Sequence, residues 1–185
     1  MKQASQANKE RRPLAVQMGH RIREGLLLLA CALSVFLLVS FCSYHNTDPG
    51  WSSTGVGDKV LNWGGRAGAF CADVFLSIFG WIAFLFPPLF IFGAWTGVTN
   101  KAEREKFNSI EVFFKVLGFV LIILSSCGLI DVFIKNYFAH LPTVSGGILG
   151  DVLARGLLHV FNATGATLFL GTALLSGITL FTGFS

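Results

Sequence analysis

The most regular array of reactive side chains in this sequence is Asp151, Arg155 and His159, which stand at positions i, i+4 and i+8. On a helix these side chains share one face, and Asp followed by Arg at i+4 is the favourable order for an ion pair. His159 suggests a metal or proton-transfer role, but no second metal ligand accompanies it at helical spacing. We therefore interpret the row as the solvated polar face of a helix.

Other elements of known sites are incomplete. The glycine-rich stretch Gly64–Gly68 lacks the G-K-[ST] ending of a phosphate loop and the strand that precedes one. The four cysteines form no C-x-x-C pair and no cluster with histidine. If the exoplasmic side is oxidising, a disulfide between Cys42 and Cys71 is an alternative that the sequence does not decide. We predict no catalytic residue, no metal ligand and no cofactor-binding residue in this chain.

The composition is typical of a membrane protein. Of the 185 residues, 53% are hydrophobic and only 13% are charged, about half the charged share of soluble domains. The net charge of +4 is modest, and the basic residues form no face suited to nucleic acid. Four long runs without Asp, Glu, Lys or Arg instead indicate helices that cross a hydrocarbon core, which takes about 20 residues each.

We predict an all-α membrane protein with four transmembrane helices, near residues 25–43, 74–98, 112–130 and 164–184. The runs are apolar on all sides and do not alternate, which excludes the strands of a membrane β-barrel. Residues 1–24 form a basic segment ahead of the membrane domain, which occupies residues 25–185.

The basic residues predict the orientation. Nine of the 14 Lys and Arg residues fall before the first span or between the second and third, and a tenth, Lys115, stands just inside the third span. Four fall in the other two loops. The positive-inside rule then places both termini and the middle loop in the cytoplasm. The loops near residues 44–73 and 131–163 are expected on the exoplasmic side.

The exoplasmic loops hold the candidate contact residues. In the first loop these are two aromatic rings suited to the membrane interface and the glycine–arginine segment that follows: Trp51, Trp63, Gly64, Gly65 and Arg66. In the second loop, apolar residues opposite the polar row predict a short interfacial helix over residues 145–159, with Asp151 and Arg155 as candidate contacts.

One feature within the spans interrupts the helical pattern. Pro87 and Pro88 fall in the middle of the predicted second span, where missing N–H groups would kink the helix. A small channel or transporter could use such a break, and this is the alternative function. The absence of charged residues at mid-membrane argues against it, because transport paths are marked by such groups.

Several segments together resemble the N-terminal four-span domain of the FtsK/SpoIIIE family of DNA translocases, in particular its gammaproteobacterial members. The segments are SYHNTDPGWS, NWGGRAGAFCADVFLSIFGWIAFLFP, LSSCGL, SGGILG and LFTG, in this order from residue 43 to residue 183. Each segment is short, but their order and spacing together make the resemblance specific. It extends from about residue 21 to residue 185.

The resemblance implies a bacterial inner-membrane protein at the division septum. Its partners would be the lipid bilayer and septal proteins, and its role would be anchoring and assembly of a machine that couples division to chromosome segregation. The whole protein would be a hexameric translocase whose cytoplasmic linker and motor use ATP, Mg and DNA. This chain contains no Walker A sequence, so we expect a non-enzymatic piece of that longer protein.

Overall fold

The computed structural model describes residues 2–55, 59–99, 109–134 and 142–183. Within these ranges the regular elements are all helical and there is no strand. The elements are α1 (Lys2–Cys42), α2 (Gly65–Phe79), the 3-10 helix η1 (Gly80–Leu85), α3 (Phe86–Thr99), α4 (Ser109–Ile134) and α5 (Gly147–Thr182). The basic residues predicted for the middle loop, 101–106, lie outside the described residues.

Four helical stretches are long and apolar enough to cross a membrane. They are Glu24–Cys42, Gly65–Trp95, Val112–Ile134 and Gly147–Thr182. The chain is therefore an all-α membrane protein with four membrane-spanning helices, as the apolar runs predict.

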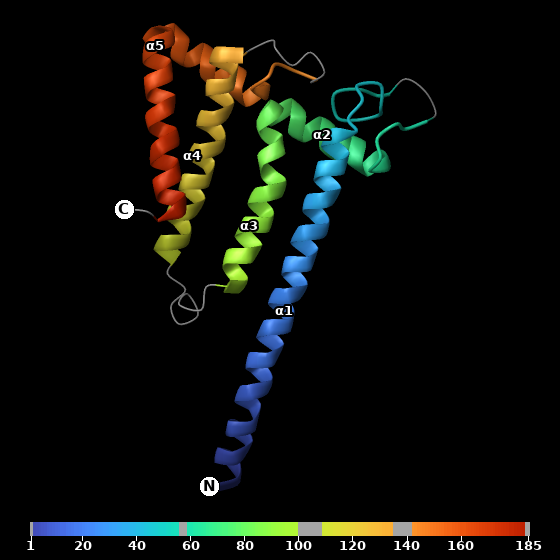
Figure 1. The fold of residues 1–185 in the computed structure, drawn as a ribbon, viewed down its shortest axis with the longest axis vertical. Helices are drawn as coiled ribbons and strands as arrows, with labels where there is room; N and C mark the ends of the chain where they lie inside the picture. The colour runs from blue at the N-terminus through green and yellow to red at the C-terminus, as the bar shows by residue number, and fades with distance from the viewer. Residues whose placement is uncertain (1, 56–58, 100–108, 135–141, 184–185) are drawn as a thin grey trace.

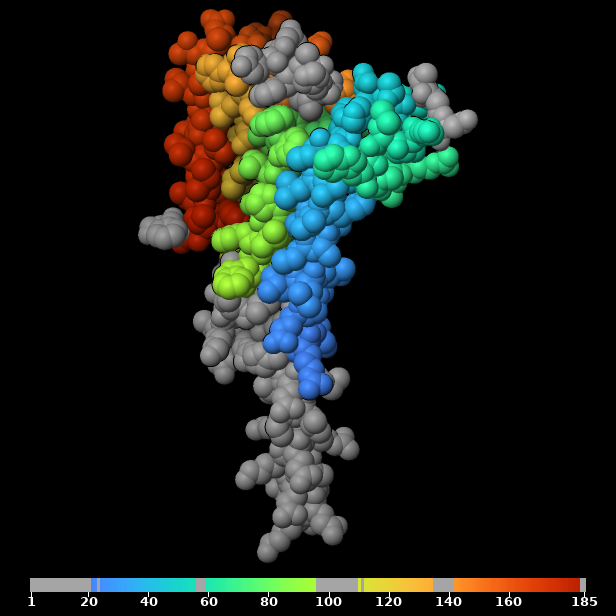
Figure 2. Space-filling view, turned by 45° about the vertical axis from the view of Figure 1, so that its right-hand side comes forward, coloured from blue at the N-terminus to red at the C-terminus, as the bar shows by residue number. Residues whose placement is uncertain are grey.

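The helices pair in two halves, residues 24–99 and residues 109–183. In the first half α1 packs along α3, and in the second half α4 packs along α5. Figure 2 shows α1 and α3 side by side as well, with α2 projecting beyond α1 at the upper end. The two helices of each pair run in opposite directions, so the C-terminal ends of α3 and α5 lie toward the same end of the bundle (Figure 1).

Each half follows the same path. A spanning helix rises, a connecting segment follows, and a second helix then lies across the end of the bundle before the chain turns down into the next span (Figure 1). We call the helix that lies across the end of the bundle the crossing helix. In the first half it is α2, and the turn comes at Gly80, with φ of 58°. In the second half residues 147–161 of α5 cross, and the turn comes at Asn162, with φ of 52°. The second crossing segment is the predicted interfacial helix.

The repeated path has a repeated sequence. With an offset of 82 residues, residues 63–80 align with residues 145–162 and are identical at six positions. The identical pairs are Gly64/Gly146, Gly65/Gly147, Gly68/Gly150, Ala72/Ala154, Leu76/Leu158 and Phe79/Phe161. The conformations also agree, because Gly65 and Gly147 have φ of 65° and 69°. The turns align too, since Gly80 and Asn162 both have positive φ.

The predicted second span, residues 74–98, is divided. Residues 74–79 belong to the crossing helix, and the descending helix begins only at Phe86. The reason is Gly80, whose positive φ cannot continue a helix. Pro87 and Pro88 therefore stand in the first turn of α3 rather than in mid-helix. In a first turn proline breaks no hydrogen bond, because those N–H groups have no partner within the helix.

The two halves meet through backbone contacts at the upper end. The Trp81 N–H donates to the Ser145 carbonyl over 2.9 Å, and the Thr143 hydroxyl donates to the Ser77 carbonyl over 3.1 Å. A Cβ on Gly80 would lie 2.5 Å from the Gly147 nitrogen, so only glycine permits this approach. Below the contact, aromatic rings pack between the halves, with the ring centroids of Phe86 and Phe119 6.1 Å apart.

Candidate functional site

The loop that follows α1 is held in place by hydrogen bonds to buried side chains. Asp48, only 5% exposed, accepts from the Leu61 and Asn62 N–H groups, each over 2.8 Å. These bonds fix the two ends of a 13-residue excursion against each other. The Asp48–Pro49 turn therefore acts as a clamp within the loop rather than as a free connection.

Asn62 fastens the same loop to the last turn of α1. Its amide group donates to the Ser40 carbonyl over 2.8 Å and to the Ser43 carbonyl over 3.2 Å. Its side-chain oxygen accepts from the Gly64 N–H over 2.8 Å. The Ser43 hydroxyl in turn accepts from the Trp63 N–H over 3.0 Å. Carbonyls that the end of α1 would leave unpaired are thus satisfied by the loop.

A second carboxylate ties the loop to α2. Asp73, 3% exposed, accepts from the Ser52 N–H over 2.5 Å, from the Ser52 hydroxyl over 2.8 Å and from the Tyr44 hydroxyl over 3.1 Å. Burial, together with the charge of Asp73, raises the pKa of Tyr44, so the phenol stays a neutral donor. Bonds to a buried charge are among the stronger hydrogen bonds in proteins.

Gly64 and Gly68, at the start of α2, allow this helix to approach α1 closely. A Cβ on Gly64 would lie 2.6 Å from the Ser40 hydroxyl oxygen, and one on Gly68 would lie 2.5 Å from the Asn62 side-chain oxygen. Between them, Gly65 has positive φ but open space around it. Two of these glycines are therefore needed for packing and the third for its backbone conformation.

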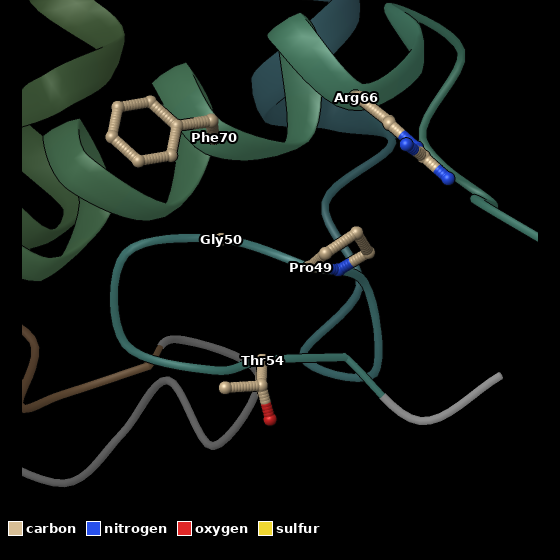
Figure 3. Close-up of a pocket in the computed structure, with 5 residues that line it drawn as sticks. All are labelled: Pro49, Gly50, Thr54, Arg66 and Phe70. Carbon is tan, nitrogen blue, oxygen red and sulfur yellow. The ribbon is translucent and has the colours of Figure 1, made fainter. Parts of the chain in front are cut away.

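A cavity of about 420 Å³ opens between this loop and α2. It is lined by Pro49, Gly50 and Thr54 from the loop and by Arg66 and Phe70 from the helix (Figure 3). Arg66 and Phe70 are one helical turn apart and project from the same helix, with the Pro49–Gly50 backbone below them (Figure 3). The candidate residue Arg66 is thus part of a built cavity that the spacing of the sequence did not indicate.

The other candidate residues of the first loop lie at the surface around it. Trp51 is 56% exposed and Trp63 is 80% exposed, so neither ring is used to pack the loop. Large exposed aromatic rings at the ends of spans are typical of the membrane interface or of a protein contact.

Asp151 and Arg155 belong to the other half of the molecule. They form the expected i, i+4 pair on α5, with the Arg155 Nε donating to a carboxylate oxygen of Asp151 over 2.8 Å. Arg155 is 71% exposed. The side of this helix that packs inward is made of small residues, Gly147, Gly150 and Ala154. The structure therefore separates the two sets of candidate residues predicted from the sequence.

The spacing of the sequence did not indicate the buried network of Asp48, Asn62 and Asp73, because Asp and Asn are common in loops and nothing local marks these three as buried. The alignment of residues 63–80 with 145–162 was missed as well. Among the described residues, no three His, Cys, Asp or Glu side chains gather as a metal site, and both Cys42 and Cys71 are free thiols.

The chain matches a known family model over most of its length. Residues 19–185 match the model described as the 4TM region of DNA translocase FtsK/SpoIIIE. No solved structure gives a significant match.

Curated relatives agree with this match. The chain is 34% identical over 170 residues to the DNA translocase FtsK of Pseudomonas syringae pv. syringae, which covers 91% of this chain and 21% of that protein. It is 36% identical over 167 residues to the DNA translocase FtsK of Vibrio vulnificus, covering 89% of this chain and 16% of that protein. The chain thus spans about a fifth of the length of these relatives.

Proposed function

Since the chain belongs to the family of the four-transmembrane region of FtsK/SpoIIIE DNA translocases, we propose that it anchors a translocase at the division septum and helps assemble the division machinery there. The membrane-anchoring part of this role follows from the four spanning helices. The septal part is supported by the first loop. Its backbone is fixed by Asp48, Asn62 and Asp73, yet it leaves Trp51 and Trp63 exposed.

The orientation is part of the proposal. The loop with the buried carboxylates and the crossing helices lies on the exoplasmic side, and both termini lie in the cytoplasm. The excess of basic residues before the first span and between the second and third supports this assignment. It would place Trp51, Trp63 and Arg66 where exoplasmic domains of other division proteins could reach them.

In this proposal the remainder of the translocase moves the DNA. The relatives are named DNA translocases, and this chain covers only their membrane region. ATP, Mg and DNA would bind to a cytoplasmic motor outside this sequence, and a hexameric motor would bring six copies of the membrane region together. The membrane region would hold that motor at the site where the septum closes.

The septal role is tested by removing the exposed rings without disturbing the loop. The double variant Trp51→Ala/Trp63→Ala keeps every hydrogen bond to Asp48, Asn62 and Asp73, because those bonds use other groups. We expect it to insert and accumulate normally in cells depleted of the native translocase but to lose septal localisation and to divide poorly. The matched control is Trp95→Ala, which removes a ring that is 57% exposed near the opposite end of α3.

Equal division and localisation by the double variant and the parent would show that the first loop is only a connection. The orientation is tested separately, with Lys59→Cys and Arg104→Cys in a cysteine-free background. A maleimide that cannot cross membranes should label position 59 and not position 104 in cells with a permeabilised outer membrane. The reverse labelling would overturn the assignment.

A further inference from the structure

The cavity between the first loop and α2 has walls that are fixed by the fold. The Gly50 N–H donates to the Ser53 carbonyl over 2.8 Å, which closes the loop into a turn. A Cβ on Gly50 would lie 2.5 Å from an oxygen of Asp73, so the backbone of this wall is pressed onto the buried carboxylate. Ser52 is bonded to the same carboxylate through both its N–H and its hydroxyl. The loop wall of this open cavity is therefore held in place by the fold.

The charge that lines the cavity has no role in the packing of the helix. At the position equivalent to Arg66, the second half has Ile148, although the surrounding glycines and alanine are the same. Arg155 of the second half is neutralised by Asp151, whereas within the described residues Arg66 forms no ion pair. Arg66 is thus an exposed cation that forms no ion pair within the described residues and has no counterpart at the aligned position of the second half.

The carboxylates nearest to the cavity do not serve as partners for Arg66. Asp73 already accepts three hydrogen bonds, from Ser52 twice and from Tyr44. Asp48 accepts two, from the N–H groups of Leu61 and Asn62. Both carboxylates are buried behind the loop backbone, at 3% and 5% exposure. An anion entering the cavity would face the guanidinium and the loop backbone first.

The position of the cavity indicates the source of such an anion. The helix α2 lies across the ends of the spans and projects beyond α1 (Figures 1 and 2). On this helix Phe70 is 50% exposed, and Trp63, which precedes the helix, is 80% exposed. Exposed aromatic rings at a span end lie at headgroup depth. A guanidinium beside them is at the level of lipid phosphates.

We propose that this cavity binds the phosphate headgroup of an anionic phospholipid from the adjacent leaflet. Arg66 pairs with the phosphate, since a guanidinium matches phosphate geometry with two parallel donors. Phe70 contacts the apolar glycerol and upper acyl region, and the Pro49–Gly50 wall limits the headgroup to a small one. The site is independent of the septal role, because it requires only that the chain is inserted in a membrane.

The test is a titration of the purified chain, delipidated in neutral detergent, with short-chain phosphatidylglycerol and, separately, with phosphatidylcholine. Bound lipid is counted by native mass spectrometry. We expect saturable binding of phosphatidylglycerol in preference to phosphatidylcholine. Arg66→Gln should weaken the phosphatidylglycerol binding on the order of tenfold, because one charge-assisted pair is lost. Phe70→Ala should weaken the binding of both lipids.

The matched control is Lys59→Gln, which removes the other cation of the same loop, at an exposed position that does not line the cavity. It should bind phosphatidylglycerol as the parent does. Arg66→Lys should restore part of the binding, because the charge returns without the two parallel donors. Thermal unfolding of each variant without lipid should be unchanged, since Arg66 is exposed.

Two results would overturn the proposal. Equal phosphatidylglycerol affinity in Arg66→Gln and the parent would show that the cavity does not hold the headgroup. Displacement of the lipid by inorganic phosphate at millimolar concentration, with the same dependence on Arg66, would assign the site to a free phosphate ion instead of a lipid.

Discussion

The two halves of this molecule share a set of small residues and a turn residue, here called the frame, and differ in the other residues of the crossing helices and loops. In both halves two glycines start a crossing helix, a third glycine and an alanine pack it inward, and a residue with positive φ turns it down into a span. In the first half the buried network of Asp48, Asn62 and Asp73 supports a cavity, and among the described residues of the second half the aligned positions provide no such network. In the second half the corresponding helix face carries Ile148 and Val152 in place of Arg66 and Phe70.

This difference separates architecture from recognition. Most of the glycines that repeat have no space for a larger side chain, whereas Gly65 is needed for its positive φ. The residues that differ include exposed ones, Arg66 and Phe70 against Ile148 and Val152. We therefore expect substitutions in the frame to reduce stability in either half. Substitutions on the outer faces should instead change binding, and only in the first half.

The largest loss of unfolding free energy should come from substituting Gly147, the frame glycine at the contact between the halves. In Gly147→Ala the new Cβ would lie 2.4 Å from the Ile78 carbonyl oxygen, at a φ of 69°. Collision and backbone strain together should cost on the order of 3 kcal/mol or more in unfolding free energy. The control is Gly65→Ala, which has nearly the same φ but open space, and should cost about 1–2 kcal/mol. Equal costs, measured by unfolding in detergent, would show that the contact between the halves contributes nothing.

A smaller effect is expected from the buried carboxylate of Asp73 in the first half. Asp73→Asn keeps the size of the side chain but removes the negative charge that accepts three hydrogen bonds. We expect a loss of about 1.5–3 kcal/mol in unfolding free energy. Asp151→Asn, in the exposed pair of the second half, should leave the melting temperature almost unchanged. Similar losses for both would mean that the first loop is no better fixed than the second crossing helix.

One hydrogen bond of that network can be removed alone. Tyr44→Phe deletes the donor that reaches Asp73 over 3.1 Å and leaves both Ser52 bonds in place. The expected loss is about 1 kcal/mol. Proteolysis of the loop in intact membranes should accelerate in the same proportion, because the open state becomes more populated. An unchanged rate would indicate that Ser52 alone holds the loop.

The smallest effect should follow from giving the second half the cation of the first. Ile148 is 41% exposed, so Ile148→Arg adds a charge without a collision and should change the unfolding free energy by about 0.5 kcal/mol or less. It should not bind phosphatidylglycerol as Arg66 is expected to, because the cavity wall from the first loop is missing there. A gain of binding equal to that of Arg66 would show that charge at this depth is sufficient without a cavity.

The sequence by itself determined the class of the protein and the number of its spans. Apolar runs of about 20 residues cannot be buried in a chain of this size with so little charge, so they predict a membrane protein before any contact is known. The spacing of Asp151 and Arg155 also predicted their pair, since an i, i+4 contact depends on the helix alone.

The tertiary structure decided where the spans bend and which polar residues are buried. Hydropathy does not distinguish a helix that spans a membrane from one that lies across the end of a bundle. The apolar run therefore gave no sign that residues 74–79 continue α2 and that the descending helix begins only at Phe86. The roles of Asp48, Asn62 and Asp73 depend on hydrogen-bond partners up to 29 residues away in the chain. Such partners are set by the packing of the loop on α1 and α2, and no local pattern encodes them.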